Sequence, residues 1–401
     1  MKIRTLSKKL ILLAQQFPVV SVTGPRQSGK TTLVRTVFPD YAYMNLEDLS
    51  EREFALTDPK SFLRRFSGGV ILDEIQRVPS LLSYIQTFVD QNDSPGKFIL
   101  TGSQNLLIMS NVSQTLAGRT ALINLLPFTL GEILDDPFPA TGKTTEISSA
   151  KQAPPFTLEE ILFKGFYPRI HDKGLDAHDW LAAYYNTYVE RDVRGVANIG
   201  NLDTFQRFVR LCAGRSGQLL NLSSLGADCG ISHTTARQWI SILQACFIVH
   251  LLVPHHANFA KRIIKSPKLY FFDTGLLCYL LRIKEPSDII THPARGQIFE
   301  SFIFSELYKM FANSGENPPL YFWRDRTGHE MDFILDYGTE LIPIEAKSGE
   351  TISSSFFEGF KYFTSLGPPA SERGVLIHGG NELYERGKIS VRPWWGLLPH
   401  I

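Results

Sequence analysis

The chain has 401 residues, of which 41 are Lys or Arg and 40 are Asp or Glu, so its formal net charge is +1. A chain of this length exceeds one ordinary hydrophobic core and predicts two or three domains. The charge balance excludes a strongly basic protein, but it leaves room for the local basic surface that nucleic-acid binding requires.

The N-terminus and the cysteines indicate a cytoplasmic protein with no membrane partner. The apolar run Leu10–Leu13 follows several basic residues but ends at Gln15 without a cleavage site, so we expect an amphipathic helix rather than a signal peptide. The sequence has no apolar run long enough to cross a bilayer. The cysteines form no C-x-x-C pair, which favours buried thiols in a reducing compartment: Cys212, Cys229, Cys246 and Cys278.

The first strong motif is a phosphate loop of the form G-x-x-x-x-G-K-[ST], set between a strand and a helix. Its glycines let successive backbone N–H groups turn inward around phosphate oxygens, and the helix N-terminus adds partial positive charge. Lys30 is expected to reach the β- and γ-phosphates, and the Thr31 hydroxyl is expected to bind Mg²⁺. The predicted cofactors are therefore ATP and Mg²⁺, and the predicted binding residues are Gly24, Pro25, Arg26, Gln27, Ser28, Gly29, Lys30, Thr31 and Thr32.

A second motif, Gly69–Glu74, is a buried strand that ends in two carboxylates, the Walker B arrangement. Asp73 is predicted to belong to the Mg²⁺ shell, and Glu74 is predicted to orient and deprotonate the attacking water. A further strand at Phe98–Thr101 should lie between the first two motifs. Ser103 or Gln104, just after it, is therefore a candidate sensor of bound nucleotide, and a simple strand-end cap is an equally good explanation.

Strands that alternate with helices, with Ala121–Leu125 as a fifth strand, predict a parallel, doubly wound α/β sheet in residues 1–137. Together with Leu116–Arg119 and Leu126–Phe128, these motifs resemble the AAA+ ATPases. The resemblance is closest to a prokaryotic group whose ATPase domain precedes a C-terminal domain of uncharacterised function (AAA_14 followed by DUF4143). It implies a P-loop NTPase fold and a homo-oligomer, in a ring or an arc.

Enzymes similar to this group place an arginine at a subunit boundary, where it reaches the γ-phosphate of a neighbour. Arg119 is the first candidate for this role, and an intramolecular salt bridge is the alternative explanation. Arg191 and Arg194, in a helical segment that also resembles the family, are second candidates, with a structural salt bridge as their alternative.

Residues 138–155 are rich in Pro, Ser, Thr and Ala and predict a linker or long loop before a middle region at 156–290. Within that region, Ser223–Cys229, Gly230 and Thr234–Leu243 have the pattern of a helix-turn-helix, which predicts a helical, winged-helix region. The residues expected between the two helices are Ala227, Ile231, Ala236, Ile240 and Leu243.

The second helix would expose residues able to enter a DNA groove: His233, Thr234, Thr235, Arg237 and Gln238. A basic cluster follows that suits a wing or a phosphate contact: Lys261, Arg262, Lys265 and Lys268. DNA is thus a predicted partner, although a module used only for packing or assembly fits the same pattern. Asp273 is either a site residue or the cap of the next helix.

The C-terminal region, 291–401, resembles the PD-(D/E)xK nuclease fold, an α+β restriction-endonuclease-like domain, by the order of its charges. Glu300 lies on an amphipathic helix, Asp332 on a strand, and Glu345 and Lys347 on one face of the next strand. The resemblance implies that Asp332 and Glu345 hold Mg²⁺, that Glu300 supports its water shell and that Lys347 activates the attacking water. Met331 stands where the motif usually has proline, and the same fold without cleavage is the alternative.

The sequence therefore predicts a Mg²⁺-dependent ATPase that acts on or with DNA and has a nuclease-like C-terminal domain. The alternative is an ATP-switched DNA-binding regulator or scaffold without significant turnover or cleavage.

Overall fold

The computed structural model describes residues 2–92, 94–102, 115–135, 153–189, 202–255, 265–366 and 373–396. Several predicted positions lie outside the described residues: Ser103, Gln104, Arg191, Arg194, Lys261, Arg262 and most of the 138–155 segment.

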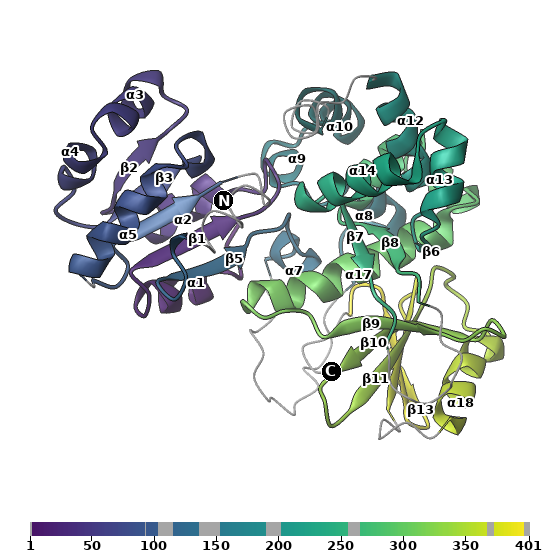
Figure 1. The fold of residues 1–401 in the computed structure, drawn as a ribbon. Helices are drawn as coiled ribbons and strands as arrows, with labels where there is room; N and C mark the ends of the chain where they lie inside the picture. Colours follow the sequence, from purple (N-terminus) through teal and green to yellow (C-terminus); the bar gives the residue numbers. More distant parts are fainter. Residues whose placement is uncertain are drawn as a thin grey trace.

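The N-terminal domain is built on a parallel sheet in the order β2-β3-β4-β1-β5, shown in purple and blue at the left of Figure 1. The order confirms the expectation that the third apolar strand lies between the first two motifs. Every residue of β1 and β3 is buried, as expected for central strands with helices on both faces. The strands are β1 (Val19–Thr23), β2 (Ala42–Asn45), β3 (Val70–Asp73), β4 (Phe98–Thr101) and β5 (Thr120–Asn124).

Helices cover both faces of this sheet and bury a separate hydrophobic cluster on each. The expected N-terminal amphipathic helix forms, and it buries Leu10 on the sheet side while Ile11 and Leu12 stay exposed. The helices are α1 (Ser7–Ala14), α2 (Lys30–Val37), α3 (Leu49–Thr57), α4 (Pro59–Arg64), η1 (Ile75–Arg77) and α5 (Leu81–Gln91).

The middle region is mostly helical and includes an antiparallel sheet in the order β6-β8-β7. Its strands are β6 (Gln218–Leu219), β7 (Val249–Leu252) and β8 (Lys268–Phe271). The short helix α7 (Leu130–Ile133) precedes this region. The helices of the region are α8 (Leu158–Lys164), α9 (Pro168–Lys173), α10 (Ala177–Tyr184), η2 (Tyr185–Val189), α12 (Leu202–Ala213), α13 (Leu222–Cys229), α14 (His233–Ala245), α15 (Thr274–Leu280) and α16 (Asp288–Thr291).

Helices α13 and α14 form where the sequence predicted two short helices, and Gly230 at φ 70° makes the turn between them. The Ser232 hydroxyl caps α14 by accepting from the Thr235 N–H at 3.0 Å. The expected inter-helix position of Ala227 is wrong, because Ala227 is exposed and Gly226 is buried in its place. A Cβ at Gly226 would lie 2.9 Å from the Ile231 carbonyl, so only glycine permits this close approach.

The C-terminal domain is a mixed sheet in the order β13-β14-β12-β11-β10-β9, with α17 (Arg295–Asn313) on one face and α18 (Glu358–Ser365) on the other. Antiparallel β9 and β10 form a hairpin around Thr327 and Gly328. The remaining elements are β9 (Leu320–Arg324), β10 (Glu330–Asp336), β11 (Leu341–Lys347), η3 (Ser354–Phe357), β12 (Gly374–His378), β13 (Tyr384–Arg386) and β14 (Ile389–Pro393).

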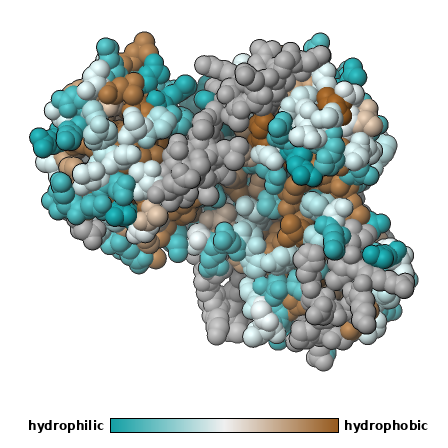
Figure 2. All heavy atoms as spheres, viewed as in Figure 1, coloured by the Kyte–Doolittle hydropathy of each residue, from teal (hydrophilic) through white to brown (hydrophobic). Residues whose placement is uncertain are grey.

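One hydrophobic cluster extends from the middle region through α17 to the inner face of the C-terminal sheet. The residues predicted as separate regions at 156–290 and 291–401 therefore share a core, whereas the N-terminal domain has its own. Figure 2 shows apolar side chains where the middle region meets the C-terminal domain and mainly hydrophilic ones on the outer side of the N-terminal domain. The cysteines are free thiols, and none of the described helices has the length and apolar character to span a membrane.

Asp273 joins three segments of this shared core. Its carboxylate accepts from the Leu276 N–H at 2.8 Å, which confirms the capping alternative, and from the Phe166 N–H at 2.7 Å. The Phe166 carbonyl in turn accepts from the Phe128 N–H at 2.9 Å. Burial raises the pKa of the Asp273 carboxyl.

Gly165 packs directly on Asp273, and its replacement tests this junction. In Gly165→Ala the added Cβ would lie 2.6 Å from Asp273 Oδ1, at φ 68° and ψ −161°, a conformation that favours glycine. We expect a loss of about 3 kcal/mol in the free energy of unfolding, measured by urea denaturation. The matched control is Gly174→Ala, at φ 60° with open space around its Cβ, which should lose only about 1 kcal/mol. Equal losses in the two variants would contradict this account.

Candidate functional site

The phosphate loop joins β1 to α2 at the carboxyl edge of the sheet, and its two glycines have conformations that side chains disfavour. Gly24 has φ 146°, and a Cβ there would lie 2.1 Å from the Leu125 carbonyl oxygen. Gly29 has φ 92° at the N-cap of α2. Glycine at position 24 therefore lets the loop pass close to Leu125, just after β5, and glycine at position 29 lets α2 begin from a left-handed backbone.

Lys30 lies inside this curl rather than on the surface. Its side chain is buried, and Nζ donates to the carbonyl oxygens of Gly24 at 3.0 Å and Pro25 at 2.8 Å. The ammonium therefore lies within the loop that would surround the phosphates.

The Asp73 carboxylate accepts hydrogen bonds from hydroxyl groups on three other elements of the domain. Its Oδ2 accepts from Thr31 at 2.8 Å and from Tyr43 at 2.7 Å, and its Oδ1 accepts from Thr101. Burial and the bond to Asp73 raise the pKa of the Tyr43 phenol, which keeps it a donor. The Thr31 hydroxyl and the Asp73 carboxylate are adjacent oxygen donors, so this pair fits Mg²⁺. The sequence analysis missed Tyr43 and Thr101, because strand positions carry no separate signal for contact with a neighbouring strand.

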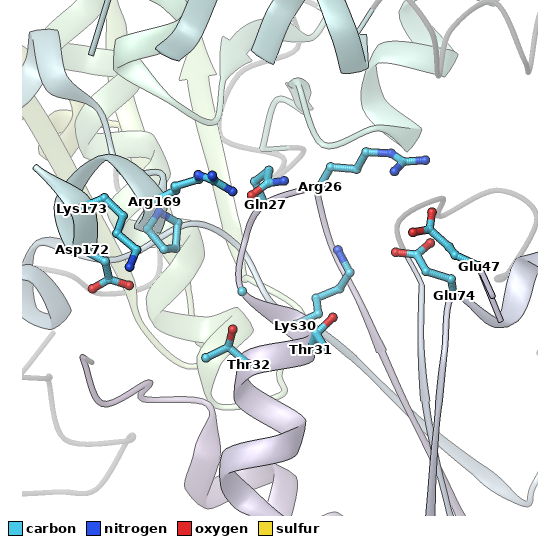
Figure 3. Close-up of a pocket in the computed structure, with 12 residues that line it drawn as sticks. Arg26, Gln27, Lys30, Thr31, Thr32, Glu47, Glu74, Arg169, Asp172 and Lys173 are labelled. Atoms are coloured by element: carbon cyan, nitrogen blue, oxygen red, sulfur yellow. The ribbon is translucent and has the colours of Figure 1, made fainter. Parts of the chain in front are cut away.

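Glu74 directly follows β3 and has a left-handed backbone at φ 57°. Such strain in a non-glycine residue is concentrated at functional sites. The Gln76 amide donates to its carboxylate. In Figure 3, Glu74 and Glu47 lie together on one side of the cavity, facing Lys30.

The opposite wall comes from α9 of the middle region. The cavity has a volume of about 470 Å³, and Pro168, Arg169, Asp172 and Lys173 line it together with the phosphate loop. Pro168 lies at the first turn of α9, and its Cγ is 4.0 Å from where a Gly29 Cβ would stand. Sequence reasoning missed Arg169 and Lys173 because they are far along the chain from the loop. The available signal was local: Pro168 begins the helix that carries both residues.

Arg4 holds the back of the phosphate loop from the N-terminal segment. Its buried guanidinium donates to the Ser28 carbonyl at 2.7 Å, the Leu126 carbonyl at 2.6 Å and Glu132 Oε1 at 3.2 Å. The fully buried Glu132 also accepts from the Thr5 N–H at 2.7 Å. One ion pair therefore links the loop, the start of the chain and α7.

Arg119 lies at the beginning of β5, and the phosphate loop follows the far end of the neighbouring strand β1. Its guanidinium forms an ion pair with Asp90 and donates to the Ala117 carbonyl at 3.1 Å. The intramolecular salt bridge considered from the sequence is therefore present. A role towards a neighbouring subunit stays a prediction.

A second cluster of charges lies between the middle region and the C-terminal sheet. Carboxylate oxygens of Glu300, Glu330 and Asp332 lie within 4.8 Å of one another. Lys268, from β8, donates to Glu300 Oε1 at 2.9 Å and pairs with Glu330. Tyr270, also from β8, donates to Glu300. The expected DNA-phosphate contact of Lys268 is wrong, because its side chain is only 2% exposed and is held by carboxylates.

Asp332 also contacts Lys347 on the neighbouring strand β11, where Glu345 lies. Its Oδ2 accepts from the Ala346 N–H at 2.9 Å and from Lys347 Nζ at 3.4 Å, and Lys347 also pairs with Glu345. Glu345 packs on Gly359 of α18, 2.9 Å from where a Cβ would stand. The structure thus brings Asp332, Glu345 and Lys347 together, and Asp332 together with Glu300. Glu345 is not part of the three-carboxylate group found among the described residues.

Burial and neighbouring charges shift the pKa values of these carboxylates in different directions. Burial, and then the charge of Asp332, raise the pKa of Glu345, and burial raises that of Glu300 to about 7. Burial opposes ionisation of Asp332, but the ammonium groups of Lys347 and Lys268 lower its pKa. The oxygen donors are of the kind that Mg²⁺ uses, but Lys268 already lies in contact with two of the three carboxylates, so this cluster does not fit a divalent cation as it stands.

Comparison with known families matches an AAA domain to residues 16–134, a domain of unknown function (DUF8612) to 156–287 and a domain of unknown function (DUF4143) to 295–397. Uncharacterized protein Rv2008c of Mycobacterium tuberculosis is 30% identical over 339 residues, which cover 84% of this chain and 72% of the relative. Uncharacterized protein MJ1544 of Methanocaldococcus jannaschii is 23% identical, with 82% and 75% covered. Among solved structures, the Walker-type ATPase paby2304 of Pyrococcus abyssi has a TM-score of 0.44 at 12% identity, covering 69% of this chain and 95% of that one.

The wall formed by α9 makes a prediction for nucleotide affinity. Arg169→Ala should weaken ATP binding roughly tenfold, because a cationic donor facing phosphate is lost. Isothermal titration with a slowly hydrolysed ATP analogue measures this. Arg210→Ala, which removes an exposed arginine of α12 outside the cavity, should leave the affinity unchanged. An unchanged affinity in Arg169→Ala would remove α9 from the site.

Proposed function

We propose that this chain, which belongs to the family that joins an AAA domain to a DUF4143 domain, is a Mg²⁺-dependent ATPase. It would act as a homo-oligomer on or with DNA. The AAA domain supports ATP binding and hydrolysis in general terms. The observation that carries the proposal is that Lys30, Thr31 and Glu74 line one cavity whose opposite wall is α9, with Asp73 bonded to Thr31.

Each residue has a role that its position supports. Lys30 would leave its carbonyl partners to meet the β- and γ-phosphates, while Thr31 and Asp73 would hold Mg²⁺. The bound ion would neutralise charge on the phosphate oxygens. Glu74 would orient the attacking water and accept its proton, and Arg169 and Lys173 would add positive charge from α9. Arg119, released from Asp90, would serve a neighbouring subunit.

Two substitutions separate binding from hydrolysis. Lys30→Ala should lose nucleotide binding, because the cation inside the loop is removed. Glu74→Gln should keep ATP bound and lower turnover at least roughly 100-fold, the usual contribution of a general base. Phosphate release and fluorescent-nucleotide binding measure the two effects. Glu74→Gln with turnover equal to that of the unaltered protein would show that another group is the base.

The proposal of DNA binding rests on the middle region. The order α12-β6-α13-α14-β7-β8, with antiparallel strands, supports the predicted winged helix. In this arrangement α14 has the exposed residues His233, Thr234, Arg237 and Gln238. For the C-terminal domain we favour the nuclease-like fold in a DNA-binding or assembly role. The second candidate function is an ATP-switched DNA-binding regulator or scaffold.

ATP turnover with and without DNA distinguishes these two functions. Single-stranded, duplex or branched DNA should increase turnover severalfold, and Arg237→Ala should reduce this stimulation without changing basal turnover, because it removes a cation from the proposed groove-facing helix. Lys60→Ala, an exposed charge on α4, is the matched control. Tight DNA binding without any stimulation would favour the regulator, and no DNA binding at all would contradict both.

A further inference from the structure

We propose that the Lys268 ammonium takes the place of a divalent cation in the Glu300, Glu330 and Asp332 cluster. It thereby fastens the middle region to the C-terminal sheet and leaves that cluster without metal-dependent chemistry. This inference is independent of ATP hydrolysis. Of these carboxylates, the sequence predicted Asp332 as a metal ligand and Glu300 as support for the water shell of the metal.

The Lys268 ammonium lies against two of the three carboxylates. Three carboxylates with oxygens within 4.8 Å of one another repel unless a cation lies among them. Lys268 Nζ contacts Glu300 at 2.9 Å and also contacts Glu330. Asp332, the third member, bonds instead to Lys347, and Arg324 pairs with the second oxygen of Glu330 at 2.9 Å. Each carboxylate therefore already has a cation of this chain as partner.

The Lys268 side chain is buried and its backbone is held by neighbouring strands. The Lys268 side chain is 2% exposed and its Nζ lies 5.6 Å from the centre of the Phe322 ring. Its backbone is fixed because β8 pairs with β6 and β7 on either side. A divalent ion could enter only if this ammonium left the carboxylates, and it would then be buried without a partner, which is strongly unfavourable. Lys347, at 33% exposed, has no such constraint.

The residues of this cluster come from two different regions of the chain. Lys268 and Tyr270 come from the middle region, whereas Glu300 lies on α17 and Glu330 and Asp332 lie on β10. The ion pairs therefore cross the boundary between two regions that also share a hydrophobic cluster. The proposed DNA-facing helix α14 and the C-terminal sheet consequently form one body.

The test is Mn²⁺ binding to the full chain, without nucleotide, at pH 8, measured by electron paramagnetic resonance of the free ion. The Asp73→Asn background removes the other predicted metal site. In this background we expect no Mn²⁺ bound at the C-terminal cluster. Adding Lys268→Met should free the carboxylates, so that one Mn²⁺ binds per chain and raises the melting temperature, although the variant is less stable without metal.

Lys309→Met is the matched control. Lys309 is also buried, at 1% exposed, but it pairs with the single carboxylate Glu306 at 3.2 Å. Its replacement should lower stability without creating Mn²⁺ binding, because one carboxylate does not form a site. A folded Lys268→Met protein that binds no Mn²⁺ would overturn the proposal.

A second test uses the protein with Lys268 intact, so it does not depend on whether Lys268→Met folds. Mn²⁺ binding in the Asp73→Asn background that disappears with Glu330→Gln, a change outside the Asp332, Glu345 and Lys347 group, would overturn the proposal. So would cleavage of DNA in Mn²⁺ that is lost in Glu330→Ala. Intact DNA and absent Mn²⁺ binding would support it.

Discussion

The arrangement of the nucleotide cavity depends on how the phosphate loop is held from behind. A loop made of glycine and exposed backbone has little side-chain packing of its own, so its shape must come from neighbours. Arg4 supplies one neighbour by binding the Ser28 carbonyl, and Pro168 supplies the other beside Gly29. The first comes from the start of the chain and the second from the middle region, so the loop is fixed only when all three segments have folded together.

The same contacts link the phosphate loop to the rest of the molecule. Glu132, on α7, pairs with Arg4. The N–H of Leu130, on the same short helix, donates to Glu306 of α17 at 2.9 Å. Lys309, one turn further along α17, donates to the Phe128 carbonyl at 2.9 Å. A buried polar path therefore runs from the loop to α17, the helix that also carries Glu300. The path is contiguous in space, and chains of packed and hydrogen-bonded side chains of this kind can carry coupling between sites.

Charge in the C-terminal domain is balanced by groups of the chain itself. Two lysines do this from different positions: Lys268 is fully enclosed, and Lys347 remains partly open to solvent. A buried ion pair costs desolvation, so it contributes less to stability than to defining which surfaces meet. Here the surfaces that meet are strand β8 on one side and helix α17 with strand β10 on the other.

Local sequence determined the parts of this protein whose conformation follows from neighbouring residues. The phosphate loop, the buried strand ending in Asp73 and Glu74, and the two helices around Gly230 were predicted because glycine, caps and hydrophobic period act over a few residues. The tertiary structure alone decided which distant side chains joined them. Tyr43 and Thr101 meet Asp73 through strand order, Arg169 reaches the cavity through the docking of α9, and Lys268 is buried because β8 packs on α17. Those contacts depend on segments that lie tens to hundreds of residues apart, and no periodicity within a segment encodes them.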